Sequence, residues 1–324
     1  MPTILTLLRG LWGMNSLGSS RQWLAPALTM ASLATSACAL LGLPSPAPAS
    51  LTPHPHTCAC SLHLPLRSEA ANNYTHFKTR FAAIAENAGV NSGSGTNMYY
   101  SVNDGLTHFI FWDSEAFWSQ PLDSQTAMIN WLRSDLAAAN ANRAAVPWVV
   151  ALAHTAWWMD ATIQCPSGAG CVVWQMLQEG GVDLHFMGHI HYYARDLPEY
   201  PNAANGTGAV DAAAAGPNLG NASNPVQVYT NPRFMTSIIT AAPGDQEVNR
   251  RALHATAPAV GAGQHSVCST NNYGFGYLQI VNRTHAMWRF ETSVPHVNTT
   301  AKAFTDDLTL IVENHGPRNN LPPV

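Results

Sequence analysis

The sequence predicts an α/β fold, and two apolar strands separated by a helix are the main reason. Residues 147–154 and 181–191 are short, almost continuously apolar runs that end in histidines, as strands inside a sheet do. Residues 171–180 lie between these runs, have a helical pattern and end in glycine. A strand, a helix and a second strand form an α/β unit, whose sites gather at the carboxyl ends of the strands.

The elements on either side of this unit agree with that fold class. Asn103-Asp104-Gly105 is a turn signal between two β-rich runs, which predicts a hairpin over residues 97–114. Residues 123–140 have helical spacing, with Asp123 or Ser124 as the expected N-cap. The chain after residue 200 predicts a loop at 207–224 and strands at 226–230, 236–241, 276–281 and 285–292.

The composition is poor in charge, and its acidic residues are unevenly placed. Only about 10% of the 324 residues are charged, and no Asp or Glu occurs before Glu69. A net charge of −4 gives no basic surface for nucleic acid, and 46% hydrophobic residues are enough to build a core. We therefore divide the chain into an acid-free extension (1–68), a folded part (69–316) and a tail (317–324).

The acid-free extension allows three interpretations. Trp23–Leu43 is uncharged and largely apolar, and Ala47-Pro48-Ala49 follows it, as in a signal peptide. Its arginines and serines also fit a transit peptide, and the third interpretation is an untargeted, non-functional segment or a wrongly assembled gene sequence. A membrane role is not expected outside this segment. The proline-rich linker after it contains histidines and cysteines, but Cys58-Ala59-Cys60 lacks the usual zinc-finger spacing.

Three histidines form the strongest candidate site. Gly188-His189-Ile190-His191 follows the second apolar strand, and His154 ends the first. Adjacent strand ends bring these side chains to one edge of a sheet, and histidine is a common ligand of zinc and iron. The sequence therefore predicts a metal site at His154, His189 and His191.

Several segments, in order, resemble purple acid phosphatases, which are calcineurin-like metallophosphoesterases. They are NNYTHFKTRF, MYYSVNDGLTHFI, INWLRSDL, WVVALAHTAWW, GGVDLHFMGHIHYYARDLPEY, YGFGYLQIVNRTHAMWRF and AFTDDLTLIVENHG. The resemblance covers about residues 69–316. It implies a four-layer α/β (α+β) sandwich of two mixed sheets flanked by helices, of which this chain holds the C-terminal part.

The resemblance also implies an activity and a cofactor. The family hydrolyses phosphate monoesters with a binuclear centre of Fe(III) and Zn, Mn or Fe(II). Carried over by motif, His154 and His189 hold the divalent metal and His191 the iron. Tyr193 and Arg195 follow in the same loop, where they either orient substrate or pack.

The sequence departs from the family where the aspartates should be. The motifs GDxG, GDxxY and GNH(E/D) are absent, and the one Gly-Asp pair is Gly244-Asp245. The family's second catalytic histidine has no match either, because His185 lies within a strand and is expected in the core. We therefore expect weak or no phosphatase activity, no identifiable catalytic residue and at most one weakly held divalent metal. The alternatives are a non-catalytic secreted glycoprotein that kept the fold, and a truncated gene model of an active phosphatase.

Other features concern the compartment of the protein. Cys165 and Cys171 flank a short Gly- and Pro-containing loop and are candidates for a disulfide. Sequons for N-glycosylation occur at Asn73, Asn205, Asn221, Asn282 and Asn298. These features fit a secreted, vacuolar or lysosomal hydrolase, and no pattern indicates an oligomeric state.

Overall fold

A computed structural model describes most of the folded part of the chain. The described residues are 74–156, 158–159, 162–163, 169–200, 209–211, 213–214, 227–241, 266–270, 273–292, 305–319 and 321. The predicted boundaries at residues 68 and 316 stay predictions.

The larger sheet has seven strands in the order β1-β2-β3-β6-β11-β7-β12. Their bounds are Tyr100–Asp104 (β1), Thr107–Phe111 (β2), Trp148–Leu152 (β3), Leu184–Met187 (β6), Thr236–Thr240 (β11), Tyr193–Asp196 (β7) and Ser266–Thr270 (β12). β1 and β2 form an antiparallel hairpin, whereas β2, β3, β6 and β11 run parallel to one another. The carboxyl ends of these four strands therefore meet at one edge of the sheet.

The smaller sheet has four strands in the order β10-β15-β14-β13. Their bounds are Gln227–Thr230 (β10), Thr305–Ile311 (β15), His285–Thr292 (β14) and Gly274–Ile280 (β13). β13 and β14 are joined by a tight turn, and β10 pairs with β15 in parallel. Two short pairs complete the strands: β4 (Trp158–Met159) with β5 (Thr162–Ile163), and β8 (Glu199–Tyr200) with β9 (Ala209–Val210).

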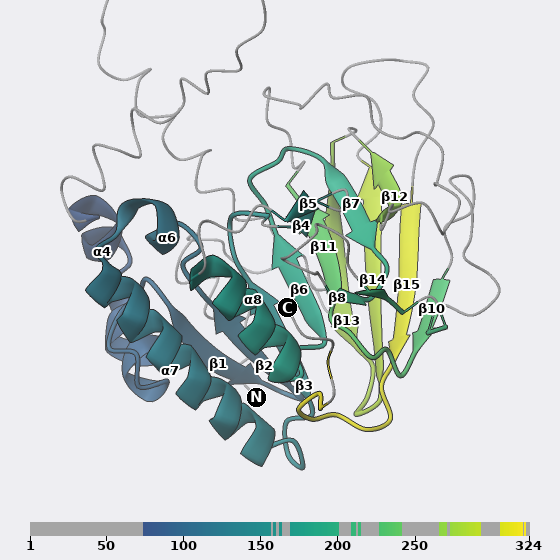
Figure 1. The fold of residues 1–324 in the computed structure, drawn as a ribbon, viewed down its shortest axis with the longest axis horizontal. Helices are drawn as coiled ribbons and strands as arrows, with labels where there is room; N and C mark the ends of the chain where they lie inside the picture. The colour runs from purple at the N-terminus through teal and green to yellow at the C-terminus, as the bar shows by residue number, and fades with distance from the viewer. Residues whose placement is uncertain are drawn as a thin grey trace, which may run out of the picture.

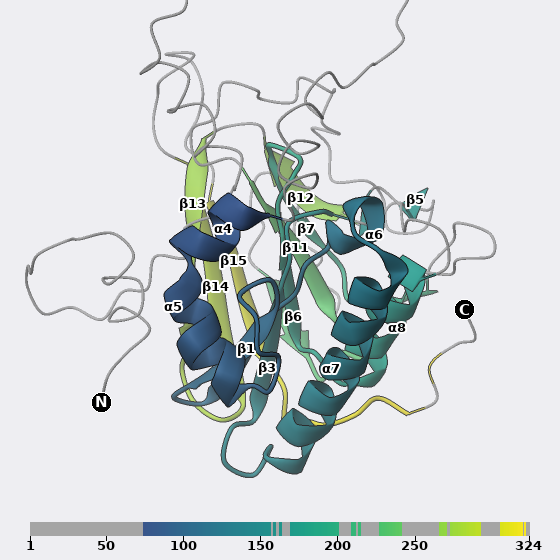
Figure 2. The ribbon, with the colours of Figure 1, turned by 90° about the vertical axis from the view of Figure 1, so that its left-hand side faces the viewer.

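Helices α7 (Leu122–Ala141) and α8 (Ala169–Glu179) cover one face of the larger sheet (Figure 1). The other described helices are α4 (Thr75–Arg80), α5 (Ala82–Ile84), the π-helical turn η1 (Ala85–Gly89) and α6 (Ala116–Ser119). Figure 2 shows α7 and α8 on the right of the larger sheet, whereas the smaller sheet and helices α4 and α5 lie on its left. Among the described residues no helix covers the outer face of the smaller sheet. None of the helices in these segments is long and apolar enough to span a membrane.

Two hydrophobic clusters hold the three layers together. Between helices and larger sheet, Leu132 of α7 and Leu177 of α8 are fully buried. Between the two sheets, Trp148 and Phe186 pack with Trp288 of β14. Burial of apolar surface contributes about 25 cal/mol per Å², so these two clusters are the main source of stability.

The α/β class and the two-sheet sandwich are as predicted, with a few local differences. The expected N-cap of α7 is wrong, because the helix begins at Leu122 and Pro121 occupies the cap position without a side-chain cap. Proline suits this place, since its φ is already helical and it has no N–H to leave unpaired. The predicted loop at 207–224 contains the short strand β9. The strands β7 and β12 and the helical segment 75–89 were not predicted from pattern.

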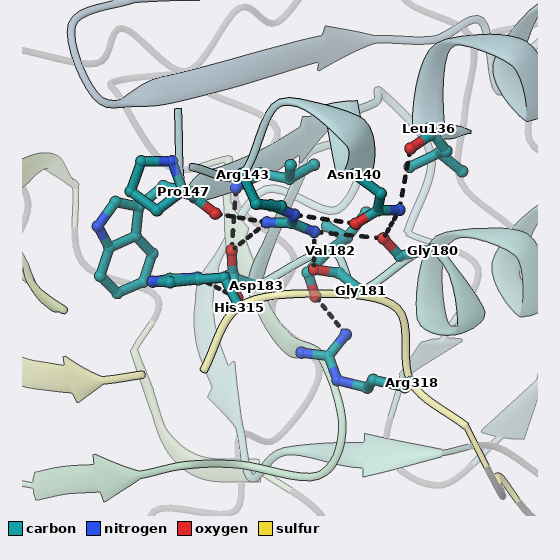
Figure 3. A network of polar contacts seen from close by, with 12 residues as sticks. Leu136, Asn140, Arg143, Pro147, Gly180, Gly181, Val182, Asp183, His315 and Arg318 are labelled. Atoms are coloured by element: carbon teal, nitrogen blue, oxygen red, sulfur yellow. Dashed lines mark hydrogen bonds and ion pairs between the residues drawn. The ribbon is translucent and has the colours of Figure 1, made fainter. Parts of the chain in front are cut away.

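A buried carboxylate, Asp183, ties the amino ends of the parallel strands together (Figure 3). Its Oδ2 accepts a hydrogen bond from the Val149 N–H (2.9 Å) and lies 3.3 Å from Nη1 of Arg143. Nδ1 of His315 lies 3.4 Å from Oδ1. Arg318 adds a bond to the Val182 carbonyl (2.7 Å), so contacts of the fold extend past residue 316.

We expect Asp183→Asn to destabilise the fold at neutral pH by about 1.5–3 kcal/mol, the range for hydrogen bonds to charged groups. Burial alone would raise the pKa of Asp183, but His315, Arg143 and Arg318 lower it below its ordinary value. A lowered pKa means that the carboxylate contributes stability above the unfolded pKa of about 3.9, and that this contribution is lost as pH falls through the folded pKa.

Urea unfolding of the wild type and of Asp183→Asn at pH 7 and at pH 3 measures this contribution. The gap between the two proteins should be large at pH 7 and smaller at pH 3. Asp123→Asn, at an exposed position of α7, is the control and should change stability little at either pH. A gap that stays constant or widens in acid would contradict the assigned role of Asp183.

Candidate functional site

Two of the predicted histidines meet at the carboxyl edge of the larger sheet. His154 lies two residues after the end of β3, and His189 two residues after the end of β6. Because β3 and β6 are neighbouring parallel strands, their ends place these side chains next to each other. The Gly188 N–H donates to the His154 carbonyl (2.8 Å), which fixes one strand end against the other.

The two imidazoles face each other through one nitrogen each. Nδ1 of His189 lies 3.3 Å from Nε2 of His154, and the ring planes are nearly perpendicular at 83°. Two nitrogens bound at about 2.0–2.1 Å to one tetrahedral zinc ion lie about 3.3–3.4 Å apart. The spacing of this pair, which we call the histidine pair, therefore fits a single shared cation.

The backbone at His189 is unusual for a residue that is not glycine. Its φ is 67°, in the left-handed region. Such a conformation costs on the order of 1–3 kcal/mol and persists only where the surrounding structure enforces it. Here it turns an exposed imidazole toward His154.

The third predicted ligand, His191, does not complete a closed set. It is buried, with 8% of its surface exposed. Within the described residues no group of three or more His, Cys, Asp or Glu side chains is placed to hold a metal ion. The binuclear centre that the family resemblance implies is therefore not matched by the donors in this part of the chain, while the histidine pair suits one ion.

Tyr193 and Arg195 lie between the two sheets, away from solvent. Both side chains are fully buried, and Arg195 forms a two-pronged ion pair with Asp306, with both nitrogen–oxygen distances at 2.6 Å. The Tyr193 hydroxyl donates to the same carboxylate (2.5 Å). Of the two roles that the sequence left open, this environment favours packing over contact with substrate.

His185 belongs to the core, as expected from its place within a strand. It is 1% exposed, and its ring lies between those of Trp112 and Trp174. Neither of its nitrogens has a hydrogen-bond partner among the described residues, and burial lowers its pKa to about 3. His185 therefore lies within β6 and packs against two indoles, away from the carboxyl end of the strand that carries His189.

The remaining predicted sites fall mostly outside the described residues. This holds for Cys165 and the side chain of Cys171, and for the sequons at Asn73, Asn205, Asn221 and Asn298. Asn282 is described: it is exposed in the turn between β13 and β14, and its Oδ1 accepts from the Thr284 N–H (2.8 Å). Cys268 is buried near Asp306 and has no disulfide partner among the described residues.

Two acidic residues near the histidine pair were missed by the sequence analysis. Asp113 and Glu115 follow β2, whose carboxyl end lies beside that of β3. The sequence contains a signal for them, because the second β-rich run of the predicted hairpin leads directly into Asp113-Ser114-Glu115. No local pattern indicates Asp306, whose partner is 111 residues away.

A family model described as calcineurin-like phosphoesterase matches residues 60–193. This match includes the histidine pair and the strands that carry it.

Curated relatives are named as acid phosphatases. The chain is 27% identical over 236 residues to human "Acid phosphatase type 7". This alignment covers 68% of this chain and 47% of the human protein. It is 28% identical over 238 residues to "Purple acid phosphatase 13" of Arabidopsis thaliana, covering 69% and 40% respectively. The chain thus spans about half the length, or less, of these relatives.

Among solved structures, a purple acid phosphatase from yellow lupin (Lupinus luteus) seeds aligns with a TM-score of 0.45 and 17% identity. This alignment covers 66% of the present chain and 32% of the lupin chain.

Proposed function

Because this chain carries a calcineurin-like phosphoesterase domain related to purple acid phosphatases, we propose that its reaction class is the metal-dependent hydrolysis of phosphate monoesters. We propose further that the chain performs this reaction weakly or not at all. The observation that carries this second proposal is the donor set: two facing imidazoles, with no third ligand beside them in the described residues.

Charge is the physical reason for the impairment. Two metal ions lower the pKa of an attacking water and clamp the attacking and leaving oxygens of a phosphate ester. Two metal ions at one site need anionic ligands to offset their positive charge, and Fe(III) prefers anionic oxygen. Neutral imidazoles offset none of that positive charge, and residues 1–68 contain no carboxylate side chain.

The histidine pair itself is proposed to hold one divalent ion. Catalytic zinc sites have three protein ligands and structural sites have four, so a two-ligand site binds weakly. In this arrangement His154 and His189 would bind the ion, and solvent would fill its other positions.

Zn²⁺ titration of the tag-free, metal-free chain by calorimetry tests this site. We expect one weak site per chain, weakened by at least about tenfold in His189→Ala, since even supporting residues of metal sites contribute 10–100-fold. Cys58→Ser/Cys60→Ser removes the two thiols of the proline-rich linker and should leave this site unchanged. Two tightly held ions, or binding that is insensitive to His189→Ala, would contradict the proposal.

A non-catalytic glycoprotein is the second candidate, and it is favoured by what the fold retains. The buried contacts of Arg195 and Asp183 are intact, although the ligand set is not. The exposed sequon at Asn282 suits a protein of the secretory route, and we propose a secreted, vacuolar or lysosomal location.

A further inference from the structure

The segment that follows β2 is hydrogen-bonded to the residue next to His154. The Thr155 N–H donates to Oγ of Ser114 (2.8 Å), and the Thr155 hydroxyl donates to Oε1 of Glu115 in a short contact. Ser114 is 1% exposed and Thr155 is 9% exposed, so the bond between them is shielded from water, whereas Glu115 is half-buried. The position of His154 is therefore coupled to this segment.

Of the two carboxylates in the segment, Asp113 accepts hydrogen bonds from α6 and from the residues on either side of that helix. Its Oδ1 accepts from the N–H groups of Glu115 (3.0 Å) and Ala116 (3.2 Å), at the start of α6. Its Oδ2 accepts from the Gln120 side chain (2.8 Å). Burial, together with the charge of Glu115, raises the pKa of Asp113 to about 7, which weakens its charge at neutral pH.

Glu115 lies next to the segment that carries His154. Its Oε1 accepts from the hydroxyl of Thr155, the residue that follows His154. Nε2 of His154 faces His189, and its Nδ1 is buried without a hydrogen-bond partner in the described residues. Because no hydrogen bond to Nδ1 fixes the ring among the described residues, its place depends on the backbone of the His154–Thr155 segment.

We infer that Glu115 is a positioning residue for cation binding at the histidine pair. It holds the His154–Thr155 segment through the Thr155 hydroxyl, and its negative charge favours a cation shared by His154 and His189. At an effective dielectric constant of about 20, unit charges several ångströms apart interact by kilocalories per mole, so one nearby carboxylate matters at a site with neutral ligands. This inference rests on the proposed metal site of the histidine pair.

The test is a Zn²⁺ titration by calorimetry of the full chain at one fixed pH near neutrality. We expect Glu115→Gln to weaken binding by about tenfold or more, the effect of removing a supporting group of a metal site. Glutamine keeps an acceptor for Thr155 and removes the charge. Thr155→Val removes the hydrogen bond, keeps the charge and should weaken binding less. Glu179→Gln, at an exposed position of α8, is the matched control and should bind as the wild type does.

Two outcomes would overturn the inference, and only the second would also overturn the metal site of the histidine pair. If Glu115→Gln binds Zn²⁺ as the wild type does while His189→Ala weakens binding, Glu115 has no such role and the histidine pair stands. If neither variant changes binding, the metal site of the histidine pair fails too. Melting temperatures of all variants are measured alongside, and a loss of affinity at an unchanged melting temperature separates cation binding from folding.

Discussion

Replacing Asp306 by alanine should destabilise the fold by about 3–5 kcal/mol, the effect of breaking a buried ion pair from one side. The carboxylate accepts two hydrogen bonds from Arg195, each 2.6 Å long, and one from the Tyr193 hydroxyl. Arg195 also donates to the Tyr229 hydroxyl (2.6 Å), and both members of the ion pair are 0% exposed. Without Asp306 the guanidinium would remain buried with its charge uncompensated.

The loss is a large part of the stability of an ordinary domain, about 5–15 kcal/mol, so the variant is best measured by urea unfolding at low temperature. The double variant Arg195→Met/Asp306→Leu provides the second measurement. Apolar residues of similar volume often replace a buried pair at little cost, so the double variant should be more stable than Asp306→Ala. A loss below about 1 kcal/mol in Asp306→Ala, the range of exposed ion pairs, would contradict the assigned role.

This ion pair also marks the limit of what the sequence could predict. Tyr193 and Arg195 were assigned to the loop after the histidines, yet they form strand β7 and face the smaller sheet. Short strands such as β7 and β12 depend on partners far along the chain, and no local period reveals them. In contrast, β3, β6 and α8 were predictable because their apolar patterns and glycine end are local.

The position of the candidate site was predictable from the sequence, but the detailed conformation of its residues was not. His154 and His189 follow predicted strands, and parallel pairing of β3 and β6 is enough to bring them together. The two histidines flanking Ile190 were both expected to be metal ligands, but His189 adopts a positive φ and is exposed, while His191 is buried. The left-handed backbone conformation of His189 makes this difference, and no pattern in the sequence indicates that conformation.

The second large effect concerns catalysis. We expect the purified chain to hydrolyse a phosphate monoester far more slowly than the roughly 1–10³ s⁻¹ of ordinary enzymes. The physical reason is the donor set: a single ion on two neutral imidazoles lacks the second ion that would share the charge of the transition state. His189→Ala should therefore change this low rate little, even though it weakens the binding of Zn²⁺.

The most direct measurement is the steady-state hydrolysis of 4-nitrophenyl phosphate by the folded, full chain with Zn²⁺, Mn²⁺ or iron added. Thermal melting of the same samples verifies that wild type and His189→Ala are folded. Our account predicts a rate near the metal-only background for both proteins. A metal-dependent turnover above about 1 s⁻¹ that is abolished by His189→Ala would contradict it.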